Sequence, residues 1–508
     1  MLRSYTMMDR LEQSNQAGRF TLPRGKEILG ELTLAGAKTS LYLHDRDFFA
    51  IQRIPDQYIR GVLHDLTKVS LFRCVTLSGT GTASQGSERY HFATLFPHFV
   101  VSGGSHLAPN ERAILEALFV IDDASTLFYD FDAFGSVLDA RPYIEQIANA
   151  NEHIIHRKVK TGSDPQILYF AGLQQICATE TVLGKISAWH CPSGNLGGPE
   201  GIWLKNTITV SIAFKEPVDF DDSVCRVGTL VPFFGLLVGR PQNILRLRLR
   251  VQAEKETPEF LEVYWSMPPA RNARYEGEKP HPADVLLDPA MKPEEFSRVL
   301  VDWLSRHDSW RDARSRFFTS FDEQIYHDID RLIRSANMFD ILPEAAAPPD
   351  AVISSDIQAA KDAAQKLFRS LPDTPERHSV LGALGRIGKS NLKHKIRDRA
   401  EIVMTQMPGR FSEITIVTDE AVNCRNHYVH GSDARIDYSA NQGMTTFFTD
   451  ALEFVFAASD LIDGGWDVKA WAGRGTTMSH PFGRFLVSYE FNLQQLKTLL
   501  PARSTPVD

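Results

Sequence analysis

The segment VTDEAVNCRNHYVHG, residues 417–431, decides how the second half of the chain is expected to fold. Thr418 and the two acidic residues after it are typical of a helix start, because their oxygens accept hydrogen bonds from the free N–H groups of the first turn. Gly431 is typical of the position just past a helix end. The segment therefore predicts a helix with three polar residues in its last turns. These residues are Arg425, Asn426 and His430.

The spacing of these three residues favours a common cluster. Asn426 and His430 are four positions apart and share one helix face. Arg425 lies roughly 140° around the helix from His430 at about 100° per residue, but its long side chain is able to swing back. Arginine and histidine also stabilise a helix C-terminus through the helix dipole alone. The residues by themselves leave two interpretations open, a helix end or part of an active site.

Helical spacing dominates the chain beyond residue 290. Pro293, followed by two glutamates, is typical of a helix start. Apolar residues then recur every three or four positions in three stretches, at 321–339, 357–371 and 448–462. We expect a connecting helix over residues 291–315 and an all-α bundle over residues 316–508.

Strand patterns dominate residues 1–290. In NILRLRLRVQ, residues 243–252, leucines alternate with arginines, as in a strand with one buried face. LGELTLAGAKTSLYLHD, residues 29–45, contains two shorter alternating runs. Helices are expected only at residues 110–122 and 141–159. The prediction is an α+β fold, with a β-rich N-terminal domain followed by the helical bundle.

Composition limits the class of protein. A chain of 508 residues requires at least two domains. With a net charge of −8, nucleic acid must be bound by a local basic surface. The five cysteines have no CxxC spacing, which favours a reducing, cytoplasmic setting and predicts no metal site or cofactor. The longest apolar run, at residues 230–239, is far shorter than the roughly 20 residues of a membrane span, and no apolar secretory segment is visible at the N-terminus.

The segment RIGKSNLKHKIRDR, residues 386–399, is the strongest local candidate for RNA binding, because it concentrates positive charge in an acidic protein. Its candidate phosphate contacts are Arg386, Lys389, Lys393 and Lys395. A solvated helix face would have the same composition, and that interpretation remains open.

Several stretches together resemble a known family. CRNHYVH, residues 424–430, matches the R-N-x-x-x-H motif of HEPN domains, which are helical nucleases and nucleotide-binding modules. GRFTLPRGKEILGELTL (18–34), KVSLFRCVTL (68–77) and VLVDWL (299–304) resemble the β-rich N-terminal half of ApeA-like anti-phage proteins. Some members carry an acidic residue on the first bundle helix, for which Asp340 is the candidate here.

The resemblance implies a function. It implies a metal-independent endoribonuclease in which Arg425, Asn426 and His430 catalyse attack of an RNA 2′-hydroxyl on the adjacent phosphate. The products would be a 2′,3′-cyclic phosphate and a 5′-hydroxyl end. It also implies a homodimer with facing motifs, tRNA as the target, and a phage component as the trigger at the N-terminal domain. The alternatives are a HEPN domain that serves only for dimerisation or nucleotide binding, and a metal-dependent nuclease.

Overall fold

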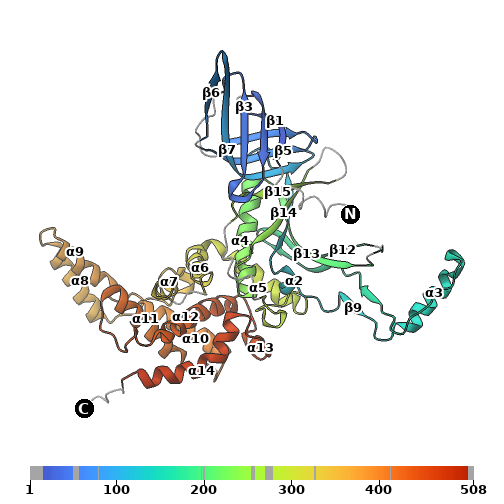
Figure 1. Cartoon of the computed structure of the whole chain (residues 1–508). Coiled ribbons are helices and arrows are strands. Elements are labelled where there is room, and N and C mark those ends of the chain that lie inside the picture. Colours follow the sequence, from blue (N-terminus) through green and yellow to red (C-terminus); the bar gives the residue numbers. More distant parts are fainter. Residues whose placement is uncertain are drawn as a thin grey trace. The chain divides into compact units, whose positions relative to one another are not determined.

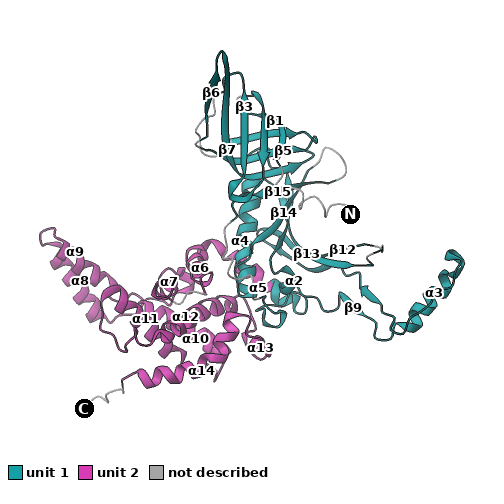
Figure 2. Ribbon diagram, viewed as in Figure 1, with its two compact units in different colours: residues 1–297 teal, residues 298–508 magenta. Residues whose placement is uncertain are grey.

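The chain divides into two compact units, residues 1–297 and 298–508, shown in Figure 2. The structure, a computed structural model, describes residues 15–501 except 24, 50–56, 78, 196, 198, 200, 253–257, 269–278, 325–327 and 412. The first unit is rich in strands and the second is helical (Figure 1), which confirms the predicted α+β class. The boundary lies inside helix α5 (Pro293–Ser305), whereas the predicted borders are at residues 290 and 315.

Six antiparallel strands of the first unit close into a barrel. They are β1 (Asn15–Thr21), β2 (Glu27–Thr33), β3 (Ser40–Asp45), β4 (Gln57–Leu63), β5 (Lys68–Thr76) and β7 (Glu88–Gly103), and β6 (Gly81–Gln85) extends the β5–β7 side. The ring closes because β7 pairs with both β3 and β5. Alternating apolar residues such as Phe20, Leu41 and Leu71 fill the interior and are fully buried. Gly61 is required there, because a Cβ at this position would lie 2.4 Å from the Phe20 ring.

The long strand β7 joins the barrel to the rest of the same large sheet. Its Leu95 pairs with β3 on one edge and with β5 on the other. Beyond Pro97, residues 99–102 of β7 still pair with β5 on one edge. Their other edge, which faced β3 before Pro97, now pairs with β15. Pro97, which lacks an N–H donor, lies at the point where the partner changes.

Outside the barrel this sheet continues from β7 in the order β15, β14, β8, β13, β12 and β11. The bounds are β8 (Ile114–Ile121), β11 (Gln175–Thr181), β12 (Gly184–Gly194), β13 (Leu204–Val218), β14 (Ile244–Val251) and β15 (Glu259–Trp265). Strand β14 confirms the leucine–arginine alternation, and its Arg248 and Arg250 form ion pairs with Glu262 and Glu116. The helix expected at residues 110–122 is wrong. This short apolar run is strand β8, which lies between β13 and β14 and is shielded by them.

The helices of the first unit differ in burial. Helix α4 (Phe220–Val238) contains the apolar run 230–239 and is largely buried, with Phe220 stacked on Phe72 of the barrel at 4.2 Å. Helix α3 (Arg141–Ile155) confirms the second expected helix but buries no residue. The remaining elements are α2 (Ala124–Leu127), β9 (Phe134–Ser136) and β10 (Leu168–Phe170). In the described part of the chain, no helix combines the length and apolar character that a membrane crossing demands.

The second unit is a helical bundle around α12 (Gln442–Asp463). The other helices are α6 (His307–Phe321), α7 (Ile329–Asp340), α8 (Ser355–Arg369), α9 (Pro375–Arg386), α10 (Leu392–Gln406), α11 (Ile414–His430), α13 (Val468–Ala472) and α14 (Pro481–Leu499). Helix α12 packs against α6, α7, α10, α11 and α14, and its apolar positions from Phe448 to Ala458 are fully buried. Figure 1 shows α8 and α9 side by side as a hairpin whose residues remain exposed or half-buried.

Three helix bounds differ from those expected. The connecting segment 291–315 contains α5 and the start of α6, which meet at Arg306. The apolar face predicted across 321–339 is divided between α6 and α7, and its member Ile325 lies outside the described residues. Helix α11 begins at Ile414 rather than Thr418, because the fully buried Thr418 uses its hydroxyl within the helix, on the Thr415 carbonyl. Its predicted end is confirmed, since Gly431 has φ +67° and donates to the His427 carbonyl.

Candidate active site

The guanidinium of Arg425 connects the three motif residues. Its Nη1 donates to Asn426 Oδ1 at 2.9 Å and to His430 Nε2 at 3.0 Å. The arginine therefore swings back along α11 far enough to bridge the angular gap to His430. The three side chains are therefore in contact, as expected from the sequence. The cluster lies at the partly exposed end of the helix.

The contact with Arg425 orients the ring of His430. A guanidinium only donates hydrogen bonds, so Nε2 of His430 is the acceptor in this contact. His430 is exposed, so an incoming group has access to the ring. In this arrangement Nε2 has the form that a general base requires.

Arg425 is a cation without an acidic partner among the described residues. Its Nη2 donates to the amide oxygen of Asn337 at 3.0 Å, so none of its three acceptors is a carboxylate. Its Nε is buried and has no hydrogen-bond partner in the described part of the chain. A guanidinium left uncompensated at a partly exposed position is suited to bind an anion such as a phosphate.

Asn337 was not singled out by the sequence. It lies on α7 and holds Arg425 from outside the motif. Asp340, the acidic candidate for this helix, is exposed, and its contact to the bundle is made by the backbone: its carbonyl accepts from Lys395 at 2.7 Å. The side chain that α7 places against the motif is therefore an amide.

A buried glutamate fixes the loop that follows the motif helix. Glu420 is only 1% exposed and accepts hydrogen bonds from Asn423, Arg435 and Tyr438 at 2.7–3.0 Å. Burial and the Glu420 contact together raise the pKa of Tyr438, so its hydroxyl remains a donor. These bonds tie residues 435–438 to the middle of α11.

Two other reactive residues of α11 are held in structural roles. Cys424 is fully buried, and burial, assisted by Glu420, raises its thiol pKa to about 12, so it is not a thiolate nucleophile. The Nδ1 of His427 donates to the Ser432 carbonyl at 2.7 Å, which fixes that ring to the helix end. Within the described residues no group of three or more His, Cys, Asp or Glu side chains is arranged to hold a metal ion.

The four candidate RNA contacts fall into two groups. Lys393 on α10 donates to Asn423 of α11 at 2.6 Å, and Lys395 donates to the α7 C-terminus, so both lie beside the motif. Lys389, in the turn before α10, instead forms an exposed ion pair with Asp350 at 3.2 Å. Arg386 is exposed at the end of α9. The structure brings Lys393 and Lys395, but not the other two, into contact with the helices of the cluster.

Comparison with known protein families covers both units. The family described as ApeA N-terminal domain 1 matches residues 16–303, and the family described as Apea-like HEPN matches residues 333–469. The second match includes Asn337, Lys393, Lys395 and the whole motif helix. No curated protein and no solved structure matches the chain. Because the first match covers more than half of the 508 residues, the chain belongs to the ApeA family, with an ApeA N-terminal domain followed by an Apea-like HEPN domain.

Proposed function

We propose that this protein is a homodimeric, metal-independent endoribonuclease of anti-phage defence, which cleaves host RNA in the cytoplasm. Family membership indicates a HEPN protein of anti-phage defence. The single observation that carries the nuclease proposal is the Arg425 cluster, in which a guanidinium without an acidic partner among the described residues contacts the Nε2 of an exposed imidazole. We propose tRNA as the RNA class and a phage component, bound to the β-rich half, as the trigger.

The proposed reaction assigns one role to each motif residue. The phosphate between two nucleotides binds the guanidinium of Arg425, whose contact with His430 then loosens. His430 Nε2 accepts the proton of the 2′-hydroxyl, and the 2′-oxygen attacks phosphorus. The bond to the 5′-oxygen breaks, and this oxygen leaves with a proton from a second acid. The products are a 2′,3′-cyclic phosphate and a 5′-hydroxyl, and Asn426 keeps Arg425 oriented throughout.

The first prediction tests His430. We expect His430→Ala to reduce cleavage of total tRNA by about 10²–10⁴-fold, the usual contribution of a general acid or base. The melting temperature should be unchanged because the side chain is exposed. Cleavage is measured in EDTA. A 2′,3′-cyclic phosphate is identified at the 3′ end of a fragment if this end cannot be ligated until the cyclic phosphate has been removed.

His378→Ala is the matched control, since His378 is an exposed histidine on α9 whose side chain forms an ion pair with Asp373. It should retain wild-type activity. Undiminished cleavage by His430→Ala would refute the assignment. Wild-type protein that binds RNA without cutting it would instead indicate a non-catalytic binding module, and activity lost in EDTA but restored by magnesium would indicate a metal-dependent nuclease.

A further inference from the structure

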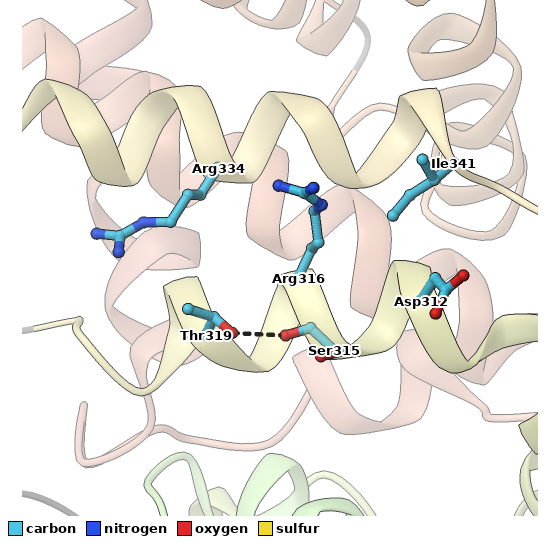
Figure 3. Close-up of a pocket in the computed structure, with 6 residues that line it drawn as sticks. All are labelled: Asp312, Ser315, Arg316, Thr319, Arg334 and Ile341. Atoms are coloured by element: carbon cyan, nitrogen blue, oxygen red, sulfur yellow. Dashed lines mark hydrogen bonds between the residues drawn. The ribbon is translucent and has the colours of Figure 1, made fainter.

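A cavity of about 440 Å³ lies between α6 and α7, one helix away from the motif. Its size is within the usual range of small-ligand pockets. Figure 3 shows Arg316 extending from α6 towards α7, and Arg334 extending from α7 on the side of Thr319, with its guanidinium directed away from Arg316. The lining residues are Asp312, Ser315, Arg316, Thr319, Arg334 and Ile341.

The cavity contains hydrogen-bond donors that the described chain does not use. Arg316 is exposed, and no described residue pairs with it by ion pair or hydrogen bond. Arg334 forms an ion pair with Glu323, but its buried Nε has no partner among described residues. Thr319 donates to the Ser315 carbonyl at 2.8 Å, so its oxygen is left as an acceptor. A buried N–H without an acceptor is unfavourable, and an anionic ligand would satisfy it.

Helix α7 connects this cavity to the motif. Arg334 and Ile341 line the cavity, and Asn337, which holds Arg425, lies between them in the sequence. At roughly 100° per residue, Asn337 is within about 60° of Arg334 and about 40° of Ile341, so the three share a broad helix face. At the C-terminal end of this helix, Lys395 adds positive charge through its contact with the Asp340 carbonyl.

We propose that the α6–α7 cavity is a second phosphate subsite, which binds a nucleotide of the RNA strand next to the one being cleaved. This inference rests on the proposed function, since a continuous strand is what would reach both sites. Arg316 and Arg334 bind the phosphate through their N–H groups. Asp312 accepts a hydrogen bond from the ribose or base, and Ile341 supplies an apolar contact for the base.

The test measures binding separately from cleavage. The affinity for a fluorescent single-stranded RNA is measured for the full-length His430→Ala protein. It is then measured for the same protein with Arg316→Ala as a second substitution. We expect affinity to fall about tenfold, as for the loss of one charged hydrogen bond. The slope of log affinity against log salt should fall by about 0.7. In the protein with His430 intact, Arg316→Ala should raise KM and leave kcat nearly unchanged.

Arg311→Ala is the matched control, because Arg311 is another exposed arginine of α6 and its side chain forms an ion pair with Asp308. Equal RNA affinity of the Arg316 and Arg311 variants would refute the subsite, whether or not the wild type cleaves RNA. The same proteins are titrated with AMP and GMP. Loss of mononucleotide binding with unchanged RNA binding would also refute the RNA subsite and would assign the cavity to a free nucleotide. Absence of wild-type cleavage, by contrast, tests only the proposed function.

Discussion

Asn337 is the residue that couples helix α7 to the motif. It accepts a hydrogen bond from Arg425 Nη2, and no acidic residue of the described chain competes for that guanidinium. A neutral acceptor orients the guanidinium without cancelling its charge. A carboxylate at the same place would orient it and also neutralise it, and the difference between these effects is measurable.

The second prediction uses this difference. Asn337→Ala should reduce kcat/KM about tenfold or more, since a hydrogen bond to a charged group contributes about 1.5–3 kcal/mol. Asn337→Asp should weaken RNA binding further and raise KM, because the new carboxylate competes with phosphate for Arg425. Both effects are obtained from steady-state kinetics with a tRNA substrate. If Asn337→Asp binds RNA as tightly as Asn337→Ala, Arg425 does not bind the phosphate through its charge.

At this scale the sequence predicted the motif but not its support. Arg425, Asn426 and His430 are close in sequence, so helix geometry alone brought them together. Asn337 is 88 residues from Arg425, and nothing local distinguishes it from any polar residue on an amphipathic helix. Glu420 was assigned to a helix start, yet it is buried in the middle of α11. Such roles follow from tertiary contacts, which local patterns do not specify.

Among the elements, α10 is the one that presents basic residues to the motif helix. The third prediction is that Lys393→Gln and Lys395→Gln weaken RNA binding, and that each lowers the slope of log affinity against log salt by about 0.7. Lys389→Gln should have a smaller effect, because Lys389 is already paired with Asp350. The measurement is RNA binding between 50 and about 200 mM salt. If all three variants have the same slope as the wild-type protein, α10 is only a solvated helix face.

Helix α12 carries the charge that holds the bundle together. Asp460 is 3% exposed and accepts hydrogen bonds from Arg314, also 3% exposed, and from Arg306. Burial alone would raise the pKa of Asp460, but the two guanidinium groups outweigh it and hold the pKa below its ordinary value. A carboxylate with a lowered pKa stabilises the fold above its unfolded pKa, and this stabilisation is lost as the pH falls through the folded pKa.

The fourth prediction follows from this pair. Asp460→Asn should destabilise the protein by about 3–5 kcal/mol at pH 7, because Arg314 is left buried and unpaired. The loss should be constant from pH 5 to about 8 and should shrink below about pH 4, near the ordinary carboxyl pKa. Urea unfolding of the full chain measures it. Asp308→Asn, at an 88% exposed side chain, is the control and should change stability by less than about 0.5 kcal/mol. A loss that does not depend on pH would contradict the role of the charge.

The pattern of elements was predictable to the extent that it is local. Alternation in β14 and helical spacing in α12 identified these elements, and Gly431 marked the end of α11. The helix predicted at 110–122 was wrong because a short, mainly apolar run fits a shielded strand as well as a helix. The change of partner along β7 was not visible in the sequence, because β7 pairs with β3, β5 and β15. Strand β15 is more than 150 residues away from β7 along the chain.

For the whole molecule, the composition of the site argues for two chains. Cleavage by the proposed route requires one group to accept the 2′-hydroxyl proton and another to protonate the leaving oxygen. In one chain, the imidazole joined to Arg425 is that of His430, while His427 is fixed to the Ser432 carbonyl. A second His430 from an identical chain, related by a two-fold axis, would supply the missing acid.

The fifth prediction is that a heterodimer of wild-type and His430→Ala chains is nearly inactive. If each reaction uses one imidazole as base and the other as acid, a single missing ring removes one of the two proton transfers, which contribute about 10²–10⁴-fold. Chains with two different affinity tags are co-expressed, the heterodimer is isolated by both tags in turn, and its rate is compared with both homodimers. The control heterodimer carries His378→Ala in one chain and should retain the full rate. A heterodimer with half of the wild-type rate would show that the two sites are independent. If light scattering finds a monomer that is fully active, the shared site is excluded, since one chain must then supply both the acid and the base.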